Sequence, residues 1–275
     1  MKIIVTGADG QLGTELQRVL GKEDLYATGI EELDITDYDA VVREVNRFGP
    51  DLIIHAAAFT DVDGAELNPD LAYKVNAVGT QNLSVAARGA GAMILYVSTD
   101  FVFDGQKKAP YHEFDDVGPL SVYGRSKLAG ERYVQSLTNS AYICRTAWLY
   151  SRHGHNFVKT MLRLGEEGRT VRVVDDQLGS PTSAADLAAK LAEIGLSGRF
   201  GIYHTTNGGQ TSWFGFAAKI FELAGMDVEM EPITSGQLDR PAPRPANSVL
   251  RSLGLELQGL EPMRSWEEAL ADYFT

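Results

Sequence analysis

Three glycines at three-residue intervals separate the first strand-like run of the chain from its first helical pattern. Residues 2–6 form a short, β-branched run typical of a strand buried on both faces. Gly7, Gly10 and Gly13 follow, and a helical pattern covers residues 11–21. Glycine lets the backbone turn sharply and approach a diphosphate without a Cβ in the way, and the free N–H groups of the helix would bind that anion. In this context the spacing favours a dinucleotide-binding turn over a purely structural one.

Strand-like and helical patterns alternate over the first 150 residues. Further strands are expected at residues 25–29, 51–57, 92–97 and 141–146, and helices at 37–48, 71–89 and 122–137. Continuous apolar strands that alternate with helices are typical of a parallel sheet covered on both faces, with right-handed crossovers. The sequence therefore predicts an α/β fold with a Rossmann-type, doubly wound parallel sheet.

The pattern becomes less regular after about residue 149. Helices are expected at residues 157–166, 184–194 and 214–224, and strands at 171–174 and 202–206. We expect a dinucleotide-binding domain over residues 1–150, to which residues 169–209 return. Residues 151–168 and 210–275 would form a smaller, interleaved C-terminal substrate lobe. The cleft between the two would hold the functional site.

Charge and cysteine content limit the possible partners. The chain of 275 residues has 25 Lys and Arg against 37 Asp and Glu, a formal net charge of −12. Nucleic acid and anionic membranes are therefore poor candidates as general partners. Cys144 is the only cysteine, which excludes an internal disulfide and fits a reducing compartment. No apolar run reaches about 18 residues and no signal-peptide layout is present, so we expect a cytoplasmic protein without a membrane span.

The end of the second predicted strand bears on the choice of cofactor. Near Gly29 the sequence has neither an acidic residue for the ribose of NAD nor an arginine for the 2′-phosphate of NADP. Glu31 and Glu32 follow closely and would disfavour that phosphate, so the pattern leans to NADH and leaves NADPH open. Asp34 and Ile35 precede the second helix, where the adenine edge would lie, unless they belong to a solvated loop.

Small residues follow the third predicted strand. They would let a cofactor lie against the backbone, with tight helix packing as the alternative. The residues are Ala56, Ala57, Ala58, Phe59 and Thr60.

A phenol and an ammonium group lie four residues apart in the helix predicted over residues 122–137. At this spacing Tyr123 and Lys127 share one helix face. A free tyrosine has a pKa of about 10, and a nearby cation would lower it. Tyr123 could then act as a general acid or base, and Lys127 could also bind the nicotinamide ribose.

Polar residues also follow the fourth predicted strand. A hydroxyl of Ser98 or Thr99 could hydrogen-bond a substrate carbonyl and stabilise charge as it develops, or the pair could form an ordinary turn. Asn76, inside a predicted helix, could hold a helix irregularity or a water chain, and a buried polar residue with no such role is as good an interpretation.

Taken in order, these motifs resemble the extended short-chain dehydrogenase/reductase family, and within it the dTDP-4-dehydrorhamnose reductases. The resemblance covers nearly the whole chain, and the ordered set is more specific than any one motif. Besides the glycine turn and Asn76, the matching segments are residues 56–63, 98–105, 123–131, 145–150, 156–157, 176–182 and 244–250.

The resemblance implies reduction of the 4-keto group of dTDP-4-dehydro-L-rhamnose to dTDP-L-rhamnose by NADH or NADPH. It implies catalytic roles for Thr99, Tyr123 and Lys127. The implied cofactor residues are Gly10, Gln11, Leu12, Asp34, Ile35, Ala58, Phe59 and Thr60, with Tyr123 and Lys127 shared, and the turn and strand add Gly7, Gly13 and Ala57.

The resemblance also implies residues that would contact the sugar, and a further residue could contact the diphosphate of the substrate. Thr99, Asp100, Tyr123 and Trp148 would contact the sugar, where the flat face of a tryptophan packs well against C–H bonds. A core aromatic is the alternative for Trp148. Arg244 could pair with the diphosphate of the substrate, or be a surface arginine.

The chain departs from the family at a metal site. Some relatives dimerise through magnesium held by acidic residues after the Pro-Thr segment, where this chain has Ala185, with Asp186 one residue further on. This argues against a metal-bridged dimer and leaves a homodimer open. The five histidines show no metal-binding spacing, and His153 and His155 are expected in an exposed loop.

Two other functions stay open. The first is another nucleotide-sugar 4-ketoreductase, an epimerase or a 4,6-dehydratase of the same fold. Dehydratases pair Asp and Glu after the catalytic Thr, and here Asp100 is followed by Phe101, which argues against dehydration. The second is a non-catalytic nucleotide-binding regulatory subunit, like that of methionine adenosyltransferase. The complete set of Thr99, Tyr123 and Lys127 argues against it.

Overall fold

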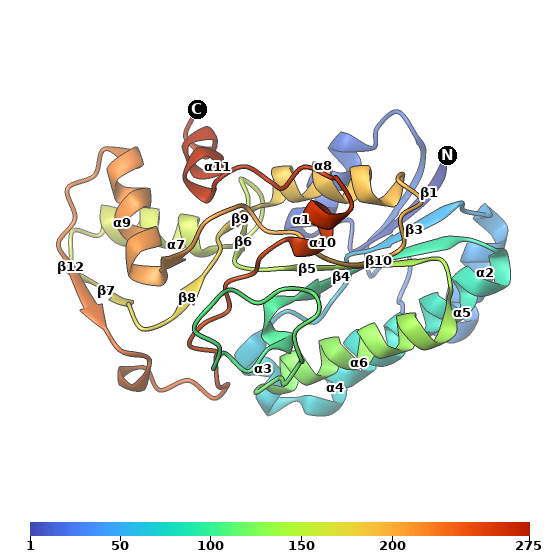
Figure 1. The fold of residues 1–275 in the computed structure, drawn as a ribbon, viewed down its shortest axis with the longest axis horizontal. Helices are drawn as coiled ribbons and strands as arrows, with labels where there is room; N and C mark the ends of the chain where they lie inside the picture. Colours follow the sequence, from blue (N-terminus) through green and yellow to red (C-terminus); the bar gives the residue numbers. More distant parts are fainter.

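A six-stranded parallel sheet forms the centre of the larger part of the molecule in the computed structural model, which describes residues 1–275 (Figure 1). Its strand order is β10-β5-β4-β3-β1-β2. The strands are β1 (Lys2–Thr6), β2 (Asp24–Thr28), β3 (Leu52–His55), β4 (Met93–Thr99), β5 (Ala141–Thr146) and β10 (Gly201–His204). The order reverses between β1 and β3, and ligands of such sheets bind beyond the carboxyl ends of the strands at that point.

Helices cover both faces of the sheet. One face packs against α1 (Gln11–Val19), α8 (Ala184–Gly195) and α10 (Leu253–Leu257), and the other against α2 (Tyr38–Phe48), α5 (Thr80–Ala90) and α6 (Val122–Leu137). In β1, Ile3 and Val5 point to the first face and Ile4 to the second, all fully buried. Burial on both faces explains the continuous apolar strands. The predicted α/β fold with a doubly wound parallel sheet is confirmed.

The helical segment predicted over residues 71–89 is not one regular helix. The chain forms α3 (Val62–Leu67), α4 (Pro69–Tyr73) and a π-helical turn, η1 (Lys74–Gly79), before α5 begins. Asn76 lies within η1. A π-turn places an extra residue in the helix, and such turns occur often at functional sites.

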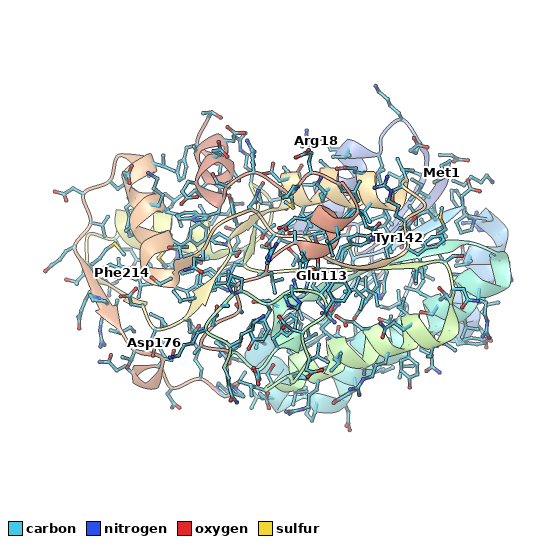
Figure 2. The ribbon with its side chains drawn as sticks, viewed as in Figure 1. Met1, Arg18, Glu113, Tyr142, Asp176 and Phe214 are labelled. Atoms are coloured by element: carbon cyan, nitrogen blue, oxygen red, sulfur yellow. The ribbon has the colours of Figure 1, made fainter.

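A second, smaller lobe has its own apolar core. Its elements are α7 (Phe157–Glu166), α9 (Trp213–Ala224), α11 (Trp266–Tyr273), β7 (Val171–Val174) and β12 (Met230–Ile233). In Figure 2, Phe214 marks this lobe and Tyr142 marks the sheet of the larger one. The remaining short elements are β6 (Leu149–Tyr150), β8 (Leu178–Gly179), β9 (Thr182–Ser183), β11 (Thr211–Ser212) and the 3-10 turns η2 (Asp100–Val102) and η3 (Ser235–Gln237).

The chain crosses between the lobes at other points than we expected. Within residues 169–209, β10 pairs with β5 of the large sheet and α8 packs against that sheet. In contrast, β7 pairs with β12 and packs in the small lobe. Leu255 and Met263, which we placed in the small lobe, pack in the core of the larger domain. The partner of β7 lies about 60 residues further on, so its placement had no local signal. We propose that the return to the larger domain begins near α8.

Candidate active site

A cleft of about 880 Å³ lies at the carboxyl ends of β1, β3 and β4, between the two lobes. Its size suits a cofactor and a small ligand together. The cleft brings together the predicted site residues from distant segments. Those that line it are Gly7, Gly10, Gln11, Leu12, Gly13, Asp34, Ile35, Ala57, Ala58, Thr60, Thr99, Asp100, Tyr123, Lys127, Trp148 and Arg244.

The glycine-rich turn forms a close-packed cradle at one end of the cleft. Gly7 has φ +73°, and a Cβ on it would lie 2.7 Å from the backbone nitrogen of Ala57. A Cβ on Gly13 would lie 2.1 Å from the carbonyl oxygen of Gly7. In α1 the Thr14 N–H donates to the Gly10 carbonyl, at 3.0 Å. The N–H groups of the three preceding residues are therefore free to bind an anion, and this cradle fits a dinucleotide.

Two carboxylates lie at the end of β2: that of Glu32, which we expected to disfavour the 2′-phosphate, and that of Asp9, which we did not expect there. The Gly29 N–H donates to Oε2 of Glu32, at 2.8 Å. The carboxylate of Asp9 also lies against Gly29, since a Cβ built there would be 1.8 Å from its Oδ2. Asp9 comes from the glycine turn, so its position depends on how the turn folds. Carboxylates suit the ribose hydroxyls of NAD and repel the 2′-phosphate of NADP.

Asn76 connects the segment after β3 to helix α6. Its Oδ1 accepts from the Phe59 N–H at 2.8 Å, and its Nδ2 donates to the Phe59 carbonyl at 3.1 Å and to Oγ of Ser126 at 2.9 Å. The helix irregularity, one of the interpretations left open for Asn76, is present. Phe59 itself does not line the cleft, contrary to expectation, because its ring packs beside Ala65 and Val122.

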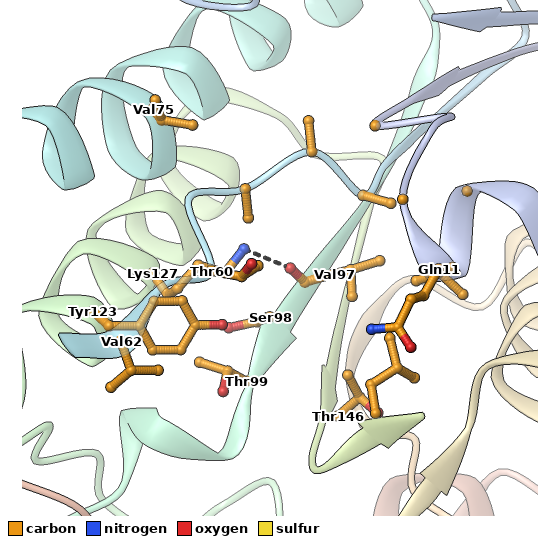
Figure 3. A pocket seen from close by; sticks show the side chains of 18 of the residues that line it. Gln11, Thr60, Val62, Val75, Val97, Ser98, Thr99, Tyr123, Lys127 and Thr146 are labelled. Atoms are coloured by element: carbon orange, nitrogen blue, oxygen red, sulfur yellow. Dashed lines mark hydrogen bonds between the residues drawn. The ribbon is translucent and has the colours of Figure 1, made fainter. Parts of the chain in front are cut away.

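Tyr123 and Lys127 lie in the first turns of α6, which Ser121 caps by accepting from the Gly124 N–H at 3.1 Å. Figure 3 shows Tyr123 and Thr99 close together at the end of β4. The Lys127 ammonium donates to the Val97 carbonyl at 2.8 Å, and Oγ1 of Thr99 donates to Oδ1 of Asp100 at 2.9 Å.

The protonation of this pair differs from our expectation that Lys127 lowers the pKa of Tyr123. Burial raises the pKa of the Tyr123 phenol to about 12 and lowers the pKa of the Lys127 ammonium to about 7. Desolvation disfavours the charged form of each, and the Lys127 ammonium is hydrogen-bonded to the Val97 carbonyl rather than to the phenol. The phenol is therefore held in its proton-donating form.

Asp100 is a buried acid at the same end of the cleft. Its side chain is 1% exposed, and its Oδ2 has no hydrogen-bond partner. Burial raises its pKa to about 6, against the opposing effect of the Ser248 and Thr99 hydroxyl groups. A buried acceptor without a partner is uncommon.

The Trp148 ring, for which we expected a contact with the sugar, is half-buried and lines the cleft. Trp213 stacks on it at 3.5 Å between ring centroids and 8° between planes, and a Cβ built on Gly179 would lie 2.3 Å from Cε2 of the ring. Trp148 also has φ +46°, the only positive value at a residue other than glycine. Trp213 lines the cleft too, and no sequence motif marked it.

Two arginines from the loop before Val249 line the cleft, and only one carries a free charge. Both Nη atoms of Arg244 donate to the carboxylate of Asp63, at 3.0 and 2.9 Å. Arg240 lines the cleft and forms no ion pair. We had singled out Arg244 for the substrate diphosphate, and Arg240, four residues earlier in the same Arg-Pro-rich run, was missed.

Comparison with known proteins places the chain in a family. The family model described as "RmlD substrate binding domain" matches residues 1–275. The chain belongs to this family. A relative from Streptomyces griseus named dTDP-4-dehydrorhamnose reductase is 46% identical over 280 residues, covering 98% of this chain and 92% of the relative.

Other members of the family differ in the ligands their names give. A crystal structure of dTDP-4-dehydrorhamnose reductase from Bacillus anthracis in complex with NADP superimposes with a TM-score of 0.97 at 45% identity, covering 100% of this chain and 99% of that one. A relative from Streptomyces antibioticus, 39% identical over 100% of this chain and 95% of its own length, is named a probable dTDP-4,6-dihydroxy-2-methyloxan-3-one 4-ketoreductase.

The acidic and histidine side chains of this family member form no group of three or more that could hold a metal ion. Asp186, beside the position of the metal ligand in some relatives, is instead paired with Arg264 at 2.7 Å. His55 and His204 are buried, and burial lowers the pKa of each to about 3. No helix has both the length and the apolar character needed to span a membrane.

Proposed function

We propose that the chain reduces the 4-keto group of dTDP-4-dehydro-L-rhamnose to dTDP-L-rhamnose with NADH or NADPH. It is an NAD(P)H-dependent oxidoreductase of its family. The observation that carries the proposal is the placement of Tyr123, Thr99 and Lys127 around one point of a cleft that starts at a dinucleotide-binding turn. Relatives named dTDP-4-dehydrorhamnose reductase support the same substrate.

The chain's own residues account for the proton and for the charge that develops. Bound NAD(P)H supplies the hydride that adds to the carbonyl carbon of the sugar. Tyr123 donates its phenolic proton to the carbonyl oxygen, which completes the hydroxyl group. The Lys127 ammonium stabilises the phenolate left behind, and the Thr99 hydroxyl holds the oxygen in place. Asp100 lines the same part of the cleft and is a further candidate to contact the sugar.

We further propose that Arg240 binds the diphosphate of the substrate. Arg244 is already paired with Asp63 of α3, and this ion pair holds the loop of Arg240 against the larger domain. The free guanidinium of Arg240 can then bind phosphate oxygens in a bidentate manner.

Replacing Arg240 with alanine is expected to raise KM for the dTDP-sugar about 10- to 100-fold, because a hydrogen bond to a charged group contributes about 1.5–3 kcal/mol. The kcat and the affinity for the cofactor should stay close to those of the unmodified protein. Steady-state kinetics with varied sugar measures this. Arg132→Ala, an exposed arginine of α6 outside the cleft, is the control. An unchanged KM in Arg240→Ala would exclude this role.

The preference for NADH is a prediction from the carboxylates at Gly29. Absorbance measures the oxidation of each cofactor with dTDP-4-dehydro-L-rhamnose as the added substrate, and we expect a higher kcat/KM for NADH. The double variant Asp9→Asn and Glu32→Gln should lower the ratio of kcat/KM for NADH to kcat/KM for NADPH about tenfold, because the repulsion of the 2′-phosphate is removed. A preference for NADPH in the unmodified protein would contradict the prediction.

The same assay tests the function, with dTDP-L-rhamnose identified as the product. No oxidation despite measurable NADH binding would move the search to other nucleotide-linked 4-keto sugars, which the Streptomyces antibioticus relative supports. It would next favour the regulatory-subunit alternative. The reduced, buried Cys144 supports a cytoplasmic location as part of the proposal, and the homodimer stays a prediction.

A further inference from the structure

A buried carboxylate lies behind the catalytic pair on the same helix. Tyr123, Lys127 and Glu131 follow one another at four-residue intervals along one face of α6. The Glu131 side chain is 1% exposed. Its Oε1 accepts from Nε of Arg145 at 2.9 Å and from Oγ of Ser98 at 2.5 Å, and its Oε2 accepts from Nη2 of Arg145 at 2.7 Å. Both carboxylate oxygens are thus hydrogen-bonded, away from the cleft.

These bonds connect α6 to the strand that carries Thr99. Lys127 donates to the carbonyl of Val97, and the next residue, Ser98, donates to Glu131. Arg145 of β5 is the direct cross-strand partner of Ser98, so the carboxylate is held by two adjacent residues of the sheet. Two consecutive residues of β4 are therefore fixed to two consecutive turns of α6, immediately before Thr99. This sets the distance and angle between Thr99 and the phenol.

We propose that Glu131, held by Ser98 and Arg145, is a positioning residue for the reduction: it fixes Tyr123 and Lys127 relative to Thr99 and supplies the negative charge that keeps Lys127 an ammonium. The inference rests on the proposed function, because the Tyr–Lys pair is its catalytic pair. Glu131 touches neither ligand and acts through Lys127.

The groups around Lys127 show that this negative charge has no substitute. Tyr123 of α6 and Tyr96 of β4 are protonated phenols, since burial raises the pKa of both, and the Tyr96 ring lies 4.2 Å from the Lys127 nitrogen. His55 of β3 is neutral, since burial lowers its pKa to about 3. Arg145 of β5 is positive and lies beyond Glu131.

Asp100, at the end of β4, acts on Tyr123 rather than on Lys127. Burial lowers the pKa of Lys127 to about 7, and Glu131 is the charge that opposes this shift. The population of the ammonium near neutral pH is therefore sensitive to the charge behind it.

Glu131→Gln is the first test, because it keeps the shape of the side chain and removes its charge. Reduction needs the ammonium, so its rate should fall as pH rises through the pKa of Lys127. Losing the negative charge lowers that pKa, and the alkaline limb of the kcat profile should move down by about one pH unit or more. The KM for the sugar should change less than about twofold. The matched control is Glu113→Gln, a buried carboxylate that accepts from the His204 N–H at 2.8 Å and leaves the limb in place.

Ser98→Ala is the second test and keeps every charge, which serves if Glu131→Gln does not fold because Arg145 is left unpaired. It should lower kcat about tenfold and leave the limb where it is. If the alkaline limb of the pH profile of kcat does not move in Glu131→Gln, the proposed effect of the charge is wrong. If kcat is unchanged in Ser98→Ala, the proposed positioning effect is wrong.

A third readout requires no turnover. NADH affinity is measured by calorimetry as a function of pH. Its pH dependence should shift to lower pH in Glu131→Gln, as the kcat profile does, because Lys127 lines the cofactor cleft. If the unmodified protein binds NADH and does not oxidise it with the sugar, the proposed function fails while this profile still tests Glu131. A binding profile identical in the two proteins overturns the role of the charge.

Discussion

Replacing Tyr123 with phenylalanine is expected to lower kcat about 1,000-fold or more and to leave NADH affinity within about threefold. The phenol is the proton donor of the proposed reaction, and burial keeps it protonated throughout the working pH range by raising its pKa to about 12. The neighbouring Thr99 hydroxyl is no substitute, because an aliphatic hydroxyl is a much weaker acid than a phenol. Phenylalanine keeps the ring and its edge contact with Phe101, at 5.5 Å between centroids, so the helix should not shift.

The experiment compares single-turnover rates with cofactor affinity measured by fluorescence. Tyr133→Phe, on the same helix and outside the cleft, removes an equivalent hydroxyl and should leave both quantities unchanged. If Tyr123→Phe retains more than about a tenth of the kcat, another group donates the proton and the proposed mechanism is wrong.

The parts of the fold that the sequence predicts well depend on local patterns. The strand expected at residues 141–146 coincides with β5, and the strand expected at 171–174 coincides with β7. Burial on both faces requires continuous apolar runs, which are visible without knowing the partner strand. The glycine spacing and the four-residue interval between Tyr123 and Lys127 are also local, and the structure brings both motifs to one cleft.

The parts that the sequence did not predict depend on distant partners. Arg244 forms an ion pair with Asp63, which lies 181 residues away in the sequence. The charge of Arg244 is therefore neutralised, whereas Arg240 has no such partner. Trp213 stacks on one face of the Trp148 ring. The prediction that Lys127 lowers the pKa of Tyr123 was wrong for a related reason. The four-residue interval brings Lys127 near the phenol, but its ammonium group is hydrogen-bonded to the carbonyl of Val97. Each outcome needs a contact with no local signature.

Gly13→Ala is expected to weaken NADH binding about 10- to 100-fold, although helix propensity alone argues the other way. Alanine is favoured over glycine within a helix by about 1 kcal/mol. At this position, however, the new Cβ would lie 2.1 Å from the carbonyl oxygen of Gly7 and 2.6 Å from Cα of Ala8. Both atoms belong to the backbone, so no side-chain rotation relieves the contact, and overpacking of this kind costs about 1–3 kcal/mol.

The turn cannot move away without losing its other contacts, because Gly7 already lies against the backbone of Ala57. A shift of the turn would carry with it the N–H groups that bind the diphosphate. Gly89→Ala, in α5, separates the two effects, because a Cβ there meets nothing within 4 Å. We expect it to raise the free energy of unfolding by about 0.5–1 kcal/mol and to leave NADH affinity unchanged. Calorimetric titration and thermal unfolding of both variants decide the matter: if Gly13→Ala also gains stability and binds NADH normally, the turn is not the cradle that we describe.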